Sequence, residues 1–180
     1  MSNRKLLTLG GPPGSGTSTL ANLLKDTMQL QYVYAGAVFR KMAKDMKMSL
    51  EDFGEYATKH PEIDKELDAK MIALAKTEGN YLLEGRMVGA LVFKEKIPAV
   101  KIWLEASMEI RAKRLTVRDK FTYEEAIQKM TKRDECDRKR YLDLYGIDPA
   151  TSSCYDLKLN SDNLLPEQLA AVITSFINNL

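Results

Sequence analysis

The chain has 180 residues, of which 44% are hydrophobic and 29% are charged. This is the composition of an ordinary globular domain, and it argues against an intrinsically disordered or a membrane-spanning protein. The formal net charge of +2 gives no overall attraction to nucleic acid or to an anionic membrane surface. We therefore expect one domain over residues 1–180 that binds neither nucleic acid nor membrane.

The N-terminal residues and the rare residue types narrow the class further. Residues 1–6 run directly into a strand-like segment, without the apolar run of a signal peptide. Cys136 and Cys154 do not form a Cys-x-x-Cys pair, so we interpret both as reduced thiols. His60 is the single histidine, which argues against Ser-His and metal-cluster chemistry. We expect a cytoplasmic, monomeric protein.

Short apolar runs alternate with stretches of helical periodicity along the whole chain. The apolar runs predict strands at residues 6–9, 31–34, 81–83, 100–104 and 155–159. Helical patterns occupy residues 16–28, about 38–46, from 49 on, 61–79, about 107–117, 122 to about 144, and from 166 on. The last helix carries an apolar face of Leu169, Val172, Ile173, Phe176, Ile177 and Leu180. This order predicts an α/β fold, with a five-stranded parallel sheet and helices on both faces.

Two helical stretches are longer than the sheet alone requires. They cover residues 36–78, where Ser49 and Pro61 mark helix starts, and residues 111–145, where Thr122 begins a capping box. Arginines are concentrated in both stretches, which favours a substrate-binding helical insert and a short lid. Elongated crossover helices are the alternative.

A glycine-rich loop connects the first predicted strand to the first predicted helix. Its spacing, Gly-x4-Gly-x-Ser, is that of a P-loop in the expected context. Glycines allow successive backbone N–H groups to surround phosphate, and the helix N-terminus adds partial positive charge. Ser18 is placed to bind Mg²⁺. We expect ATP to bind through Gly11, Pro12, Pro13, Gly14, Ser15, Gly16, Thr17, Ser18 and Thr19.

Thr17 occupies the position at which this motif usually has a lysine. The lysine normally neutralises charge on the β- and γ-phosphates, so its loss bears on catalysis. We expect arginines of the lid, Arg114 and Arg118, to supply the missing charge when the site closes. A nucleotide-binding regulator without catalytic activity is the alternative.

Charged residues follow the second and third predicted strands. Arg40 lies shortly after the second strand, and Glu84 and Arg86 end the third. Ligands of open parallel sheets bind beyond the carboxyl ends of the strands. We therefore expect Arg40 and Arg86 to hold a second phosphate opposite the P-loop, and Glu84 to bind Mg²⁺ through a water molecule.

The predicted lid carries two further groups of charged residues. Arg111, Arg114 and Arg118 share one helix face, and Arg133, Asp137 and Arg140 share another. Solvated ion pairs such as Arg133–Asp137 are the alternative interpretation, which we prefer for the neighbouring lysines. For the arginines we prefer binding and catalysis, with Arg86, Arg114 and Arg118 acting on the transferred group.

Together these motifs resemble the cytidylate kinases, in particular the short archaeal-type branch. Residues 11–19 are similar to the family's phosphate loop, which has threonine in place of lysine in some members. The resemblance extends to Ala35-Gly36-x-x-Phe39-Arg40, Glu84-Gly85-Arg86, Lys132-Arg133-Asp134-x-x-Asp137-x-x-Arg140 and Tyr141-x-x-x-Tyr145-Gly146-Ile147-Asp148. It implies MgATP-dependent phosphorylation of CMP and dCMP, with Gly36, Arg40, Arg86, Arg133, Asp137 and Arg140 binding the acceptor.

Cytosine chemistry is compatible with this assignment. Asp137 can accept a hydrogen bond from the exocyclic amino group, while Arg133 or Arg140 donates to the ring acceptors. Uracil presents the opposite donor and acceptor pattern, so such a site would discriminate against UMP. An adenylate kinase or another small-acceptor kinase of the same fold is the nearest alternative.

Overall fold

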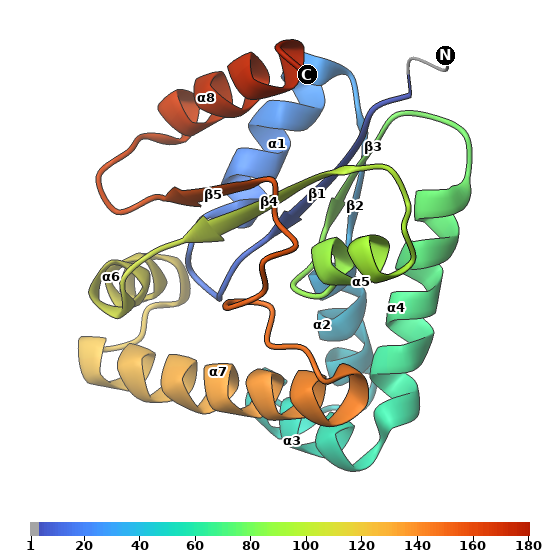
Figure 1. The fold of residues 1–180 in the computed structure, drawn as a ribbon. Coiled ribbons are helices and arrows are strands. Elements are labelled where there is room, and N and C mark those ends of the chain that lie inside the picture. Colours follow the sequence, from blue (N-terminus) through green and yellow to red (C-terminus); the bar gives the residue numbers. More distant parts are fainter. Residues whose placement is uncertain (1–3) are drawn as a thin grey trace.

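A computed structural model describes residues 4–180, and its centre is a parallel five-stranded sheet (Figure 1). The strand order is β2-β3-β1-β4-β5, and each neighbouring pair runs parallel. This confirms the predicted fold class. The strands are β1 (Leu6–Gly10), β2 (Gln31–Tyr34), β3 (Tyr81–Glu84), β4 (Val100–Glu105) and β5 (Leu157–Asn160).

Helices cover both faces of this sheet (Figure 1). Leu7 and Leu9 of β1 pack toward one face, with α1 and α8, whereas Leu6 packs toward the other, with α4 and α5. The alternation follows from the two-residue period of a strand. The helices are α1 (Thr17–Met28), α2 (Ala35–Asp45), α3 (Leu50–Lys59), α4 (Pro61–Lys76), α5 (Val88–Lys94), α6 (Met108–Asp119), α7 (Tyr123–Tyr145) and α8 (Pro166–Asn178).

The predicted insert consists of α2, α3 and α4, and the predicted lid region contains most of α6 and all of α7. The long helix α7 runs past the sheet and lies against α3 and α4 (Figure 1). Lys132 of α7 pairs with Glu55 of α3 at 2.7 Å, and Tyr145 Oη donates to Asp68 of α4 at 2.7 Å. The insert and α7 therefore contact each other directly.

The predicted starts of α3 and α7 are confirmed by their caps. The Ser49 hydroxyl accepts from the backbone N–H of Asp52 at 3.0 Å. Thr122 and Glu125 form a reciprocal capping box, with distances of 3.2 and 2.8 Å. Both caps satisfy backbone donors that a helix leaves free in its first turn.

Several predicted element bounds differ from the structure. The helix α5 was not expected, because its residues 88–92 are all buried and show no amphipathic period. The helix α2 begins at residue 35 rather than near 38, directly after β2, and β5 begins at Leu157 rather than at 155. On the last helix, Val172 and Leu180 are 43% and 80% exposed, so they do not belong to the buried face.

Within residues 4–180, no helix is both long and apolar enough to cross a membrane.

Replacing Phe53 of α3 should destabilise the protein strongly. Its ring is fully buried, with its centroid 4.7 Å from that of Phe39. Phe53→Ala should lower the free energy of unfolding by about 3–5 kcal/mol, since both apolar burial and packing are lost. The matched control is Val117→Ala at a side chain that is 85% exposed, for which we expect a change below about 0.5 kcal/mol. Urea denaturation measures both, and equal midpoints would contradict the prediction.

Candidate active site

One cavity of about 800 Å³ lies beyond the carboxyl ends of the central strands. Except for Arg111, the residues predicted to bind or act on the substrates all line it, and their individual roles remain predictions. They are Gly11, Pro12, Pro13, Gly14, Ser15, Gly16, Thr17, Ser18, Thr19, Gly36, Arg40, Glu84, Arg86, Arg114, Arg118, Arg133, Asp137 and Arg140.

The P-loop, residues 11–18, has a backbone that only glycines allow at key positions. Gly14 and Gly16 have φ angles of +82° and +96°, in the left-handed region. A Cβ atom on Gly11 would lie 2.5 Å from both the Leu104 carbonyl oxygen and the Ser15 hydroxyl oxygen. The Ser15 hydroxyl is buried and has no protein partner. A buried free donor within a glycine-rich loop at a helix N-terminus fits a bound phosphate group.

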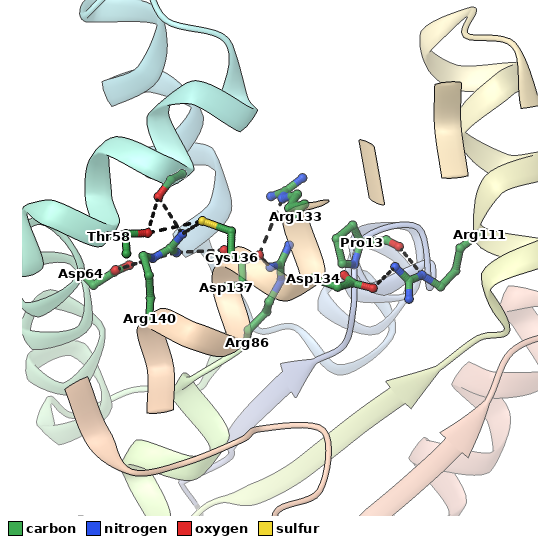
Figure 2. A network of polar contacts seen from close by, with 11 residues as sticks. Pro13, Thr58, Asp64, Arg86, Arg111, Arg133, Asp134, Cys136, Asp137 and Arg140 are labelled. Atoms are coloured by element: carbon green, nitrogen blue, oxygen red, sulfur yellow. Dashed lines mark hydrogen bonds and ion pairs between the residues drawn. The ribbon is translucent and has the colours of Figure 1, made fainter. Parts of the chain in front are cut away.

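Two arginines of α6 hold the P-loop from outside. Arg111 Nε donates to the Pro13 carbonyl at 2.7 Å, and its Nη2 pairs with Asp134 at 2.6 Å (Figure 2). Arg114 Nη1 donates to the carbonyls of Gly14 and Ser15 at 3.2 and 3.0 Å. These bonds fix the loop by its carbonyl groups. The charge of Arg114 therefore lies next to the loop, and its expected action on the transferred group stays a prediction.

Ser18 and Glu84 meet at the start of α1. Ser18 Oγ donates to Glu84 Oε1 at 2.8 Å, and Tyr32 Oη donates to the other carboxylate oxygen. Glu84 is 3% exposed. Burial and the hydrogen bond to Glu84 raise the pKa of Tyr32, so Tyr32 stays a donor. Tyr32 was missed from the sequence because it lies on a strand whose neighbour, β3, is distant in the chain.

A hydroxyl beside a buried carboxylate suits Mg²⁺, which takes oxygen ligands and completes its shell with phosphate and water. Among residues 4–180, no three His, Cys, Asp or Glu side chains gather as a cage for a metal ion. The Ser18 hydroxyl and the Glu84 carboxylate supply oxygen donors of the kind that magnesium takes.

Three arginines surround Asp137 on the opposite side of the cavity, and we call them the arginine cluster (Figure 2). Arg86 forms an ion pair with Asp137 Oδ2, Arg140 Nη2 lies 2.9 Å from Oδ1, and Arg133 Nε lies 3.8 Å from Oδ2. Burial and the neighbouring charge of Arg86 lower the pKa of Arg133 to about 9. Burial also lowers the pKa of Arg86. Asp137 compensates this positive charge only in part, and an anion that binds nearby favours the charged form of the arginines.

Two more cations of the cavity wall have different surroundings. Arg40 lies over the ring of Tyr34, 4.9 Å from its centroid. Arg118 is held by Asp119 at 2.6 and 2.8 Å. Gly36 lies so close to Tyr34 that a Cβ atom would be 2.6 Å from the ring. The glycine therefore permits the close approach of this ring.

The structure adds two acidic residues of α4 that the sequence analysis did not single out. Asp64 Oδ2 accepts from Arg140 Nε at 2.8 Å, and Asp68 Oδ2 accepts from Tyr145 Oη at 2.7 Å. Burial raises the pKa of Asp68 to about 7, Asp64 adds to the rise, and the bond from Tyr145 opposes it. The i,i+4 spacing of the two acids within the predicted insert was the available signal.

The loop after β5 was also missed. Residues 161–166 line the cavity beside the P-loop. Ser161 Oγ donates to the Ser15 carbonyl at 2.8 Å, and the Ser161 carbonyl accepts from Arg114 Nη2 at 2.7 Å. The loop carries no motif that its sequence would reveal, because its position results from the pairing of β4 with β5.

A P-loop that faces an arginine cluster across one cavity, on a parallel sheet, defines a P-loop phosphotransferase. The sequence pattern of the cytidylate kinase-like family matches residues 6–163. The chain belongs to this family.

Relatives match almost the whole chain. A cytidylate kinase of Pyrococcus horikoshii is 44% identical over 99% of this chain and 91% of its own length. A cytidylate kinase of Methanocaldococcus jannaschii is 39% identical over 97% and 98%. A shikimate kinase structure from Acinetobacter baumannii is 14% identical, with a TM-score of 0.62 over 98% of this chain and 94% of that one. At this identity the solved structure supports the fold alone.

Neutralising Asp68 should stabilise the protein at alkaline pH. Its pKa of about 7 lies above the ordinary value of 3.8, so the folded chain binds more protons than the unfolded chain between these values. Stability is therefore lost as pH rises through this window. Asp68→Asn should raise Tm relative to wild type by roughly 2–4 °C or more at pH 8, corresponding to about 1 kcal/mol, and by less at pH 4.5.

Thermal unfolding followed by circular dichroism at the two pH values measures this effect. The exposed Asp143 of α7 provides the matched control, Asp143→Asn. The same Tm difference at both pH values would contradict the prediction.

Proposed function

We propose that the chain is a nucleoside monophosphate kinase that transfers the γ-phosphoryl group of ATP to CMP or dCMP, giving CDP or dCDP. The observation that carries the proposal is one cavity in which the P-loop faces the arginine cluster. Two anionic substrates need separate positive sites at a short separation, and this arrangement provides both. The full-length relatives named cytidylate kinases support the choice of CMP.

The donor side of the proposed reaction is the P-loop. Its inward N–H groups and the free Ser15 hydroxyl would bind the ATP phosphates. Ser18, with Glu84 acting through water, would hold Mg²⁺, which when bound neutralises phosphate charge. Residues 161–166 form the wall next to Arg114, and we place the donor base against this wall.

The acceptor side is the arginine cluster together with Arg40. Arg86 and Arg133 carry the lowered pKa values that a phosphate dianion would reverse. We assign the acceptor phosphate to these two residues and Arg40, while Arg140 is held between Asp64 and Asp137. Asp137 orients the guanidinium groups, and this use of its oxygens competes with the base contact expected from the sequence.

The chemistry needs positioning and charge neutralisation more than proton transfer. The attacking oxygen of the acceptor phosphate is already anionic, so no general base is required. Arg86 and Arg118 are the proposed partners of the transferred group, and Arg114 keeps the donor loop in shape. The helices α2–α4 would act as the acceptor-binding insert, and α6 with α7 as the lid that excludes water. A monomeric state and a cytoplasmic location remain predictions from the sequence.

A coupled ADP-release assay tests the proposal. Purified protein with MgATP should release ADP with CMP or dCMP as acceptor, and with AMP, UMP and dTMP only at lower kcat/KM. A higher kcat/KM for AMP would favour the adenylate kinase alternative. ATP binding without ADP release for any of these acceptors would favour a regulator and overturn the proposed activity.

Arg118 should matter for turnover more than for ATP binding. Its side chain lines the cavity but bonds only to its neighbour Asp119 in the structure, so its removal leaves the P-loop intact. Arg118→Ala should lower kcat on the order of 10²-fold, as for other transition-state charge donors. Lys113→Ala on the same helix, at a side chain 60% exposed, is the control. Steady-state kinetics and ATP titration compare them; equal kcat values for the two variants would exclude this role.

Thr17→Ala should reduce kcat/KM far less than the loss of a P-loop lysine does in related kinases, because no charge is removed. Thr17 belongs to the P-loop, and carbonyl groups of this loop are already held by Arg111 and Arg114. The same kinetic assay checks this. Complete inactivity of Thr17→Ala, with the fold intact by circular dichroism, would show that the hydroxyl acts directly.

A further inference from the structure

The part of the cavity beyond the arginine cluster has the character of a base-binding pocket. Its wall includes Leu67, Asp68, Met87, Val88 and Tyr141, and we call these residues the base pocket. The apolar members suit the faces of a heterocycle, and one acid among them is available to read its edge. The inference below rests on the proposed function, since it concerns how that same acceptor is chosen.

Of the carboxylates that line this cavity in the described part of the chain, most are already engaged. Asp137 faces the three guanidinium groups of the cluster, and Asp64 is bound by Arg140 at 2.8 and 3.4 Å. Glu84 accepts from Ser18 and Tyr32, and Asp162 accepts from the Ser107 N–H.

Asp68 differs from them. The hydrogen bond it receives is from the Tyr145 hydroxyl, at Oδ2. No cation is paired with it among residues 4–180. Its Oδ1 is the carboxylate oxygen of the base pocket that remains able to accept, and the bond to Tyr145 fixes the plane in which it does so.

We propose that Asp68 is the specificity-determining residue for the pyrimidine base, with Oδ1 accepting a hydrogen bond from the exocyclic amino group of cytosine. A carboxylate can only accept, so it matches the amino group at this ring position. Uracil presents a carbonyl oxygen there, and its lone pairs would face the carboxylate with no proton between them.

The electrostatic surroundings of Asp68 give this contact a pH dependence. The groups that face it are Asp64 on its own helix and Arg140, Tyr141 and Tyr145 on α7, with Arg86 beyond Tyr141. Burial and Asp64 raise the pKa of Asp68 to about 7. Since the amino group bonds to the ionised form, recognition of cytosine should weaken as the pH falls below 7.

Asp68→Asn separates charge-based recognition from packing. An asparagine amide of the same shape can turn its oxygen toward the cytosine amino group or its NH₂ toward the uracil carbonyl. The preference for CMP over UMP, measured as the ratio of kcat/KM values, should therefore fall by at least about tenfold, the scale of one hydrogen bond to a charged group. Asp143→Asn makes the same chemical change at an exposed position of α7 and should keep the wild-type ratio.

A substrate that lacks the amino group gives an independent readout. Pyrimidin-2-one riboside 5′-monophosphate has the sugar and phosphate of CMP but a hydrogen in place of the amino group. Wild type should prefer CMP to this analogue by at least about tenfold, and Asp68→Ala should abolish the preference. Because both substrates carry the same phosphate, the ratio of their kcat/KM values cancels phosphate ionisation. This ratio should fall for wild type between pH 8 and pH 6.

The results of these measurements distinguish failure of the Asp68 inference from failure of the proposed function. A CMP preference over UMP and over the analogue that is unchanged in Asp68→Asn and Asp68→Ala would overturn the inference while leaving the kinase activity in place. So would a wild-type enzyme that does not distinguish CMP from the analogue. A wild-type enzyme that phosphorylates none of the nucleotides would overturn the proposed function instead.

Discussion

The ion pairs around Asp137 are the interaction on which the arginine cluster depends. Three guanidinium groups close to one another repel, and each loses hydration when it is buried. Asp137 compensates part of this cost and leaves the remaining charge directed into the cavity. A single carboxylate at this point therefore keeps the arginines in place and still leaves the pocket attractive to a dianion, which is the condition for binding a phosphate reversibly.

The P-loop lacks the usual lysine, and other residues hold it in shape. Arg111 and Arg114 hold the loop by its carbonyl oxygens, so the N–H groups remain available on the inner side. Arg111 is also tied to Asp134. The rigidity that a phosphate nest requires thus comes from α6 and α7, which follow the loop by about a hundred residues in the sequence.

The sequence was sufficient to predict the elements and residues that have a local signal. It was insufficient for those whose position depends on tertiary contacts. Alternating apolar runs and caps predicted the strands and most helices, and the P-loop spacing with strand-end arginines predicted much of the cavity wall. The helix α5 was not predicted because complete burial of residues 88–92 removes the amphipathic period. Several site residues were not predicted because each has its partner on a distant element. They are Tyr32, Asp64, Asp68 and the loop at Ser161. Tertiary pairing also affects how a residue is interpreted. Asp137, which was expected to bind the cytosine base, forms ion pairs with arginines.

The helix α7 connects all of these parts. Asp134 pairs with the arginine that holds the P-loop, Asp137 gathers the arginine cluster, Tyr141 lines the base pocket and Tyr145 donates a hydrogen bond to Asp68. Their spacing of three, four and four residues places them along one face of the helix. Eleven residues separate the first from the last, or roughly 16 Å at 1.5 Å per residue. The distance between the P-loop and the base pocket is therefore set by a continuous hydrogen-bonded helix, and any motion that shifts α7 displaces both ends together.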